Sequence, residues 1–277
     1  EPPATPNHLR ATLLWQKVIL KPMRMAYRKS PLLLLALSPL LAGCAKEDVP
    51  GLGFEEGLSS VNDQSLSLWQ GAWIAAAVVG VFTLILILWP VFFHRKKDEN
   101  FPKQTQYNIP VEVAYTVIPF IIVAVLFYFT VQRESKIVKI SPDSQVSHFI
   151  DVVGFQWSWQ FKYKDAGDYK SATVTGTPAQ PPVLYLPQGE NVRFTLDAND
   201  VVHGFWIPAF MIQMQNLPGV TNQLEFTANK LGTYPGRCNI LCGRNHAQML
   251  FTVKVVTPSE YQTYLANLVA EEKAALS

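Results

Sequence analysis

The sequence predicts a two-helix transmembrane hairpin followed by an all-β sandwich or barrel. Two uncharged, apolar runs, at residues 71–93 and 113–131, are each long enough to cross the hydrocarbon core of a bilayer. After residue 146, short segments that alternate apolar and polar residues are separated by turn residues, a pattern typical of β-strands. A crowded set of sulfur and imidazole ligands near the C-terminus then predicts a metal site in the β-domain.

Length and composition set broad bounds on the protein. The chain has 277 residues, a formal net charge of +2 and three cysteines. This length accommodates a group of membrane segments and one compact domain. The small net charge gives no indication of a nucleic-acid partner, and we expect none. Two of the cysteines belong to the crowded ligand segment, so Cys44 needs a separate explanation.

The N-terminal region has the pattern of a lipoprotein signal peptide. Residues 1–22 precede the first methionine, Met23, and we interpret them as an upstream extension. From Met23, a basic stretch precedes an apolar run at 31–40 that is too short to span a membrane comfortably. The run ends in Leu-Ala-Gly-Cys, which resembles a lipobox, so cleavage before Cys44 and its lipidation are expected. An ordinary signal peptide with a free cysteine is the alternative.

The region after the signal peptide is expected to comprise a tether and the hairpin. Residues 44–68 are mixed and polar, and we interpret them as an outer tether, with the transmembrane hairpin at 69–132. Basic residues at 94–97 follow the first apolar run directly, so the connecting loop should be cytoplasmic. The second run returns the chain to the outer side. Glu112, at the start of this second helix, complements the helix dipole.

The remaining chain is expected to form one β-domain at 133–257 and a C-terminal helix at 258–277. Thr257 is a plausible helix cap, with Pro258 at the first helical position. Many short strands at regular spacing indicate a sandwich or barrel. The candidate strands are 146–153, 155–164, 183–186, 192–196, 222–228, 233–237 and 250–256.

The ligand segment at 238–249 favours copper. Thiolate, thioether and imidazole together select copper over harder metals. Two coppers that share both sulfurs as bridges would each need one histidine and one weak axial ligand. The candidate ligands that complete this set are His203, Cys238, the backbone carbonyl of Ile240, Cys242, His246 and Met249. A disulfide and a zinc site of two cysteines and two histidines are the alternatives.

The motif Cys-x3-Cys-x3-His-x2-Met, with Asp-Val-Val-His at 200–203, resembles the CuA motif of subunit II of haem-copper cytochrome c oxidases, especially the actinobacterial lipoprotein type. The resemblance implies a cupredoxin-like Greek-key barrel. It also implies the electron-accepting subunit of an aa3-type cytochrome c oxidase, an oxidoreductase and translocase. Its dinuclear CuA would take electrons from cytochrome c and pass them to haem in subunit I, which reduces O2 to water with proton pumping.

The resemblance implies partners and a location as well. The partners would be oxidase subunit I and other oxidase subunits, and cytochrome c or a membrane-bound c-type haem subunit of a bc complex. The protein would be a multi-pass protein of the cell membrane, with its CuA domain on the extracytoplasmic side.

Three further residue assignments come from the resemblance. In the family's Gln-Trp-x-Trp segment the first tryptophan, here Trp157, accepts electrons from cytochrome c. A matching glutamate, here Glu112, lies at the mouth of a proton path. The family's magnesium-binding carboxylates are replaced here by Ile240, Gln213 and Gln215, so no magnesium site is expected on this chain.

Three other functions were weighed against this one. Subunit II of a quinol oxidase shares the hairpin and barrel, but the intact copper ligands count against it. A membrane-anchored copper carrier or assembly factor would tolerate a solvent-accessible site for one copper. Nitrous oxide reductase also uses CuA but has no reason for the hairpin.

Overall fold

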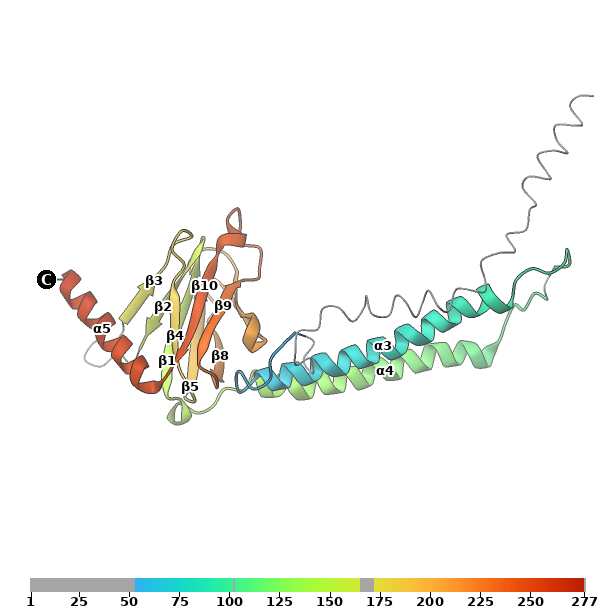
Figure 1. The fold of residues 1–277 in the computed structure, drawn as a ribbon, viewed down its shortest axis with the longest axis horizontal. Helices are drawn as coiled ribbons and strands as arrows, with labels where there is room; N and C mark the ends of the chain where they lie inside the picture. Colours follow the sequence, from blue (N-terminus) through green and yellow to red (C-terminus); the bar gives the residue numbers. More distant parts are fainter. Residues whose placement is uncertain (1–52, 102, 165–171, 277) are drawn as a thin grey trace, which may run out of the picture. The chain divides into compact units, whose positions relative to one another are not determined.

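The computed structural model describes residues 53–101, 103–164 and 172–276 (Figure 1). In this part of the chain, two long helices are followed by ten strands and a C-terminal helix. The predicted fold class, a two-helix hairpin and an all-β domain, is confirmed. The predicted signal peptide and Cys44 lie outside the described residues.

The first two helices are α3 (Asn62–Phe93) and α4 (Ile109–Ile137), and both are long and apolar enough to cross a membrane. They contact each other side by side (Figure 1). Near the start of α3 and the end of α4, the Arg133 guanidinium donates to the Gln64 side-chain carbonyl at 2.8 Å. Each helix extends beyond its apolar run, and α3 begins inside the segment that the sequence assigned to the tether.

Glu112 caps the start of α4. Its carboxylate accepts from the Asn108 backbone N–H at 2.9 Å, and the Asn108 side chain accepts from the Val111 N–H at 3.4 Å. These bonds occupy two of the donors that the first helical turn leaves free. A structural role therefore accounts for an acid at this position.

The β-domain consists of two five-stranded sheets. The pairs β1–β5 and β4–β10 are parallel and the other pairs within the sheets are antiparallel. The first sheet has the order β3 (Ala172–Thr175), β2 (Ser158–Tyr163), β1 (His148–Phe155), β5 (Asn191–Ala198) and β8 (Asn222–Thr227). The second has the order β4 (Val183–Pro187), β10 (Leu250–Val256), β9 (Gly232–Cys238), β6 (His203–Ile207) and β7 (Ile212–Asn216).

All seven predicted strands overlap an observed strand, but β3, β6 and β7 were missed. His203 is the first residue of β6. Four of the five residues of β6 are buried, so the strand shows no alternation between an apolar and a polar face. A strand that is covered on both sides is not visible as a period of two.

Aromatic side chains fill the space between the sheets. Phe205 on β6 stacks on Phe251 of β10 with ring centroids 4.9 Å apart, and Trp159 of β2 meets Phe251 edge to face at 5.4 Å. The helix α5 (Pro258–Leu276) covers part of the domain, where Tyr264 stacks on Tyr185 at 3.8 Å. These ring contacts join the two sheets and the C-terminal helix into one packed core.

A buried ion pair fixes the segment that leaves α4. Arg193 of β5 donates to the Glu225 carboxylate of β8 at 3.0 Å, and both residues are buried. Arg193 also contacts the Asp143 carboxylate and the Ser141 carbonyl, while the Ser141 N–H donates to Glu225 at 3.2 Å. The segment between the hairpin and β1 is therefore held against the first sheet.

Candidate metal centre

Neighbouring strands of the second sheet bring the ligand-bearing segments together. His203 begins β6, and β6 pairs with β9 so that Phe205 lies opposite Cys238, the last residue of β9. The chain then turns, and Met249 directly precedes β10, which pairs with the other edge of β9. The Cys238 N–H donates to the Met249 carbonyl at 3.0 Å. Both ends of the ligand loop are thus anchored on one sheet.

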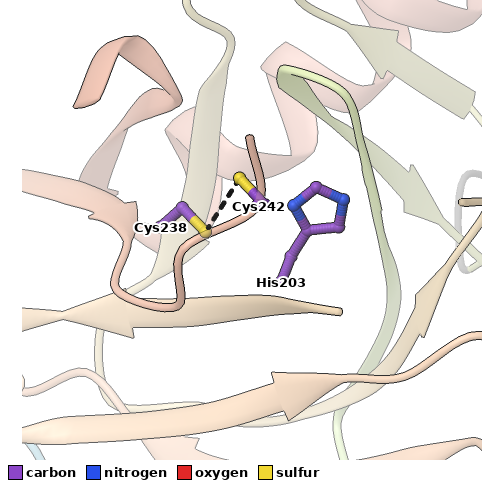
Figure 2. Close-up of side chains that lie close together, drawn as sticks. All are labelled: His203, Cys238 and Cys242. Carbon is purple, nitrogen blue, oxygen red and sulfur yellow. Dashed lines mark hydrogen bonds between the residues drawn. The ribbon is translucent and has the colours of Figure 1, made fainter. Parts of the chain in front are cut away.

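The sulfur and imidazole ligands converge in a buried cluster. The Sγ atoms of Cys238 and Cys242 lie 3.8 Å apart, and ligand atoms of His203 and both cysteines lie within 4.8 Å of one another (Figure 2). The Cys242 Sγ is 3.5 Å from the His246 Nδ1 and 3.7 Å from the Met249 sulfur. The Ile240 carbonyl lies 3.2 Å from the Cys238 Sγ. All six residues singled out as ligands by the sequence meet here.

The orientation of His203 leaves one ring nitrogen for a metal. Its Nε2 lies 2.8 Å from an Asp200 carboxylate oxygen, whereas its buried Nδ1 has no hydrogen-bond partner among the described residues. Figure 2 shows a ring nitrogen of His203 facing Cys242. Because an unpaired buried nitrogen is costly, this Nδ1 points to a missing ligand. A carboxylate on the second nitrogen is the usual partner of a metal-binding histidine.

The close packing of His203 depends on Gly154 at the end of β1. A Cβ at this position would lie 3.0 Å from two ring carbons of His203. A side chain here would push against the imidazole, so the glycine allows the first sheet to support the ligand from behind.

The two cysteines differ in their tendency to ionise. Burial opposes ionisation of Cys238, but the nearby His203 imidazole and the hydrogen bond from the Gly204 N–H lower the pKa of its thiol below the usual value. Burial and the negative charge of Cys238 raise the pKa of Cys242. Without a cation, the pair therefore favours one thiolate. A bound metal ion would release the second proton and hold both sulfurs as thiolates.

The charges around His203 also favour a cation. Burial lowers the pKa of His203, but the Cys238 sulfur and the Asp200 carboxylate outweigh it and raise that pKa. Burial raises the pKa of Asp200, but bonds from His203 and from the N–H groups of Gln156 and Val201 outweigh burial and lower it. A positive charge at His203 is stabilised from both sides, as a metal ion would be.

The arrangement distinguishes among the candidate contents of the site. Cys238 and Cys242 are free thiols, which does not fit the disulfide. Zinc would use the thiolates and imidazoles but has no use for the Met249 thioether that lies against Cys242. Thiolate, imidazole and thioether together suit copper. The residues present fit a copper centre.

A neighbouring pocket of about 410 Å3 is lined by amide and apolar side chains. It is lined by Gln213, Met214, Gln215, Asn239 and Ile240. Hard cations prefer carboxylate oxygens, and the described lining offers none.

Trp157 lies beside the ligand loop, whereas Glu112 does not. Trp157 is half-buried, and its indole N–H donates to the Cys242 carbonyl at 3.2 Å. Glu112 is on α4, far along the chain from the ligands and outside the ligand cluster.

Two residues of the site were missed by sequence reasoning. Asp200 entered the sequence analysis only as part of the Asp-Val-Val-His motif, yet its carboxylate holds His203 and accepts from the Gln156 N–H at 2.7 Å. Gln156 was not assigned a role, yet its side-chain amide donates to the Cys242 carbonyl at 2.8 Å. The spacing of Asp200 three residues before His203 was an available signal. No comparable signal exists for Gln156.

Comparisons with known proteins agree with this site. Residues 148–256 match the family model described as the periplasmic domain of cytochrome c oxidase subunit II. The chain is 40% identical to a probable cytochrome c oxidase subunit 2 of Streptomyces avermitilis, over 82% of each chain. It is 34% identical to cytochrome c oxidase subunit 2 of Mycobacterium bovis, over 83% of this chain and 78% of that protein.

A solved structure is also similar in part. The periplasmic domain of subunit II of cytochrome oxidase from Bradyrhizobium japonicum is 26% identical, and the match covers 48% of this chain and 99% of that one with a TM-score of 0.43. The identity to the full-length relatives, over most of both chains, shows that this chain belongs to the cytochrome c oxidase subunit II family, whose members are parts of an oxidoreductase complex.

Proposed function

We propose that this chain is the electron-accepting subunit of an aa3-type cytochrome c oxidase and that it holds a dinuclear copper centre of the CuA type. The observation that carries the proposal is the convergence of a buried, unpartnered His203 nitrogen on two free thiols 3.8 Å apart. His246 and Met249 lie against the second thiol and complete the donor set.

When bound, the copper centre would supply a one-electron relay between cytochrome c and the haem of subunit I, where O2 is reduced to water with proton pumping. The sulfurs of Cys238 and Cys242 and the imidazoles of His203 and His246 would hold the copper. The Met249 thioether and the Ile240 carbonyl would complete the set of donors. This set leaves no open position for a substrate, which fits a relay and excludes O2 chemistry at this centre.

Trp157 is the proposed point at which electrons arrive. Its indole donates to the Cys242 carbonyl at 3.2 Å, and the side chain is partly exposed. The partly exposed indole is thus linked to the Cys242 sulfur by one hydrogen bond and the covalent bonds within Cys242. The donor would be a cytochrome c or a membrane-bound c-type haem subunit of a bc complex.

Two helices are long and apolar enough to cross a membrane, and relatives of the chain are named as cytochrome c oxidase subunits. The proposal places the chain in the cell membrane as a multi-pass protein beside subunit I and other oxidase subunits. Because basic residues follow α3 directly, the copper domain would lie on the extracytoplasmic side.

For Glu112 we propose a position at the mouth of a proton path, in addition to its capping role. Glu112→Gln keeps an oxygen that can accept from the Asn108 N–H but cannot carry a proton. Slower proton uptake by the complex with unchanged copper content would support the role. Unchanged proton uptake would reject the role in the proton path and leave Glu112 with its helix-capping role alone.

Lipidation of Cys44 is the corresponding proposal for the N-terminal region. Cys44→Ser should abolish incorporation of a labelled fatty acid into the chain. Labelling that persists in this variant would reject lipidation at this residue.

Copper stoichiometry and electron paramagnetic resonance of the purified full-length chain test the main proposal. The expected result is two coppers per chain, with the hyperfine pattern of one unpaired electron shared by two copper nuclei. Cys242→Ser should lose the shared signal. One copper with an intense blue band would instead indicate a carrier, and bound zinc would reject the copper relay altogether.

A further inference from the structure

The turn between β1 and β2 makes hydrogen bonds to both segments that carry the proposed metal ligands. One segment is the loop with Cys238 and Cys242, and the other is the segment with Asp200 and His203. Gln156 and Trp157 form this turn, between Phe155 and Ser158. The Gln156 side-chain amide donates to the Cys242 carbonyl at 2.8 Å, and its backbone N–H donates to the Asp200 carboxylate at 2.7 Å. Asp200 in turn holds His203. One residue therefore contacts both the cysteine loop and the carboxylate behind the histidine.

We propose that Gln156 is a positioning residue of the metal centre, which braces the Cys242 peptide group against the Asp200–His203 pair and holds Trp157 in contact with the same peptide. This inference rests on the proposed function for the identity of the metal. The bracing itself is a property of this chain and is present without metal.

The Cys242 peptide group is the focus of the brace. Its carbonyl accepts from two side chains, the Gln156 amide at 2.8 Å and the Trp157 indole at 3.2 Å. The Cys242 sulfur, on the same residue, lies against Cys238, His246 and Met249. A rotation of this peptide group would therefore displace the sulfur from its neighbours. Loss of the shorter bond would leave the indole alone to oppose that rotation.

Gly243 gives independent support for a built contact. Its φ is +124°, and a Cβ there would lie 3.0 Å from the Gln156 Nε2 and 3.0 Å from the Trp157 Nε1. The residue after Cys242 must therefore be small for the amide and the indole to approach the carbonyl. The backbone of the cysteine loop and the side chains of the turn therefore pack closely against each other, as expected of residues that hold a metal ligand in place.

The exposure of Gln156 makes the inference testable. Gln156 is exposed, and replacing an exposed polar side chain usually has little effect on folding. The loss of one net hydrogen bond corresponds to about a two- to tenfold change in an equilibrium that depends on it. We expect a change of this size in the opening of the ligand loop and in copper retention.

The chain offers a matched control for this substitution. Gln188 also donates its side-chain amide to a backbone carbonyl, that of Asn229 at 2.7 Å, but it has no contact with the ligand loop among the described hydrogen bonds. Gln156→Met and Gln188→Met each remove one amide-to-carbonyl bond and keep the length of the side chain. Gln156→Glu provides a second variant that keeps the polarity and loses the donor.

The first measurement is hydrogen exchange of the metal-free, reduced full-length chain in detergent. Backbone amides of residues 238–249 should exchange about two- to tenfold faster in Gln156→Met and Gln156→Glu than in the parent chain. Gln188→Met should exchange at the parental rate in this segment. Equal rates in all four proteins would overturn the proposal, whatever metal the chain binds.

The second measurement uses the copper-loaded chain. Transfer of copper to a Cu(I) chelator should be about two- to tenfold faster in the two Gln156 variants, with altered copper hyperfine couplings and with thermal unfolding as in Gln188→Met. If the parent chain does not bind a copper pair, the proposed function is rejected. The hydrogen-exchange result would still show whether Gln156 holds the cysteine loop in place. Faster exchange accompanied by a general loss of thermal stability would assign Gln156 to folding alone and reject the proposal.

Discussion

Replacing Asp200 by asparagine should weaken copper binding by changing the proton on His203. In the parent chain, Asp200 accepts from the His203 Nε2 at 2.8 Å and from the N–H groups of Val201 at 2.6 Å and Gln156 at 2.7 Å. A carboxylate can accept from all three donors, whereas an asparagine has one oxygen and a donating NH2 group.

The asparagine would present that NH2 group either to His203 or to Gln156. Facing His203, it donates to Nε2 and forces the ring proton onto Nδ1, the nitrogen that faces the thiols. If the NH2 group faces Gln156, it lies against the Gln156 backbone N–H, and two donors then face each other without an acceptor. Loss of the residue that holds a metal-binding histidine typically lowers metal affinity about 10–100-fold, or by about 1.4–2.8 kcal/mol. We expect a decrease in copper affinity within this range.

A competition titration of the full-length chain against a copper chelator at pH 7 measures the change. Asp197→Asn is the control, because among the described residues the Asp197 side chain accepts only from the adjacent Ala198 N–H. Its substitution removes the same charge nearby. Asp200→Asn with the copper affinity of the parent would refute the argument about the tautomer. An equal decrease in both variants would assign the effect to charge alone.

Three further predictions follow from the described contacts. Trp157→Phe keeps a ring but removes the N–H that reaches Cys242, and it should slow reduction by cytochrome c in stopped-flow measurements while the copper content of the chain is unchanged. Arg193→Met leaves the Glu225 carboxylate buried without its partner and should lower the free energy of unfolding by about 3–5 kcal/mol in denaturant titrations, whereas the exposed Arg237→Met should not. Burial raises the pKa of Glu225, but hydrogen bonds from Ser141, Asn191 and Arg193 outweigh it and lower that pKa below its usual value of 4.5. The stabilisation by Glu225 is therefore complete above the unfolded pKa and is lost as the pH falls through the lowered folded pKa, which thermal unfolding between pH 7 and pH 3 would measure.

Each of these predictions has a result that contradicts it. Unchanged reduction kinetics in Trp157→Phe would show that electrons do not pass through the hydrogen bond from the Trp157 N–H. If Arg193→Met unfolds like Arg237→Met, the buried ion pair does not stabilise the domain. If Glu225→Gln shows the same loss of stability in acid as the parent chain, other carboxylates cause that loss.

Local patterns in the sequence predicted most elements of the fold and several of the side chains that cluster in the candidate metal centre. The long uncharged runs predicted α3 and α4, and alternation predicted seven strands. The ligand spacing predicted the cluster because Cys238, Cys242, His246 and Met249 lie in one short loop. A short loop keeps its side chains close together in almost any fold.

The tertiary structure decided how this loop is held and oriented. Gln156 lies 44 residues from Asp200 and 86 residues from Cys242. The pairing of β1 with β5 brings Gln156 near Asp200, whereas Cys242 follows β9 of the other sheet and reaches Gln156 only through the packing of the two sheets. The strand β6 had no visible alternation, so the start of the strand at His203 and the direction of the imidazole could not be predicted. The donor types that select a metal are a local property of the chain. The protonation and support of those donors depend on neighbours that only the folded topology supplies.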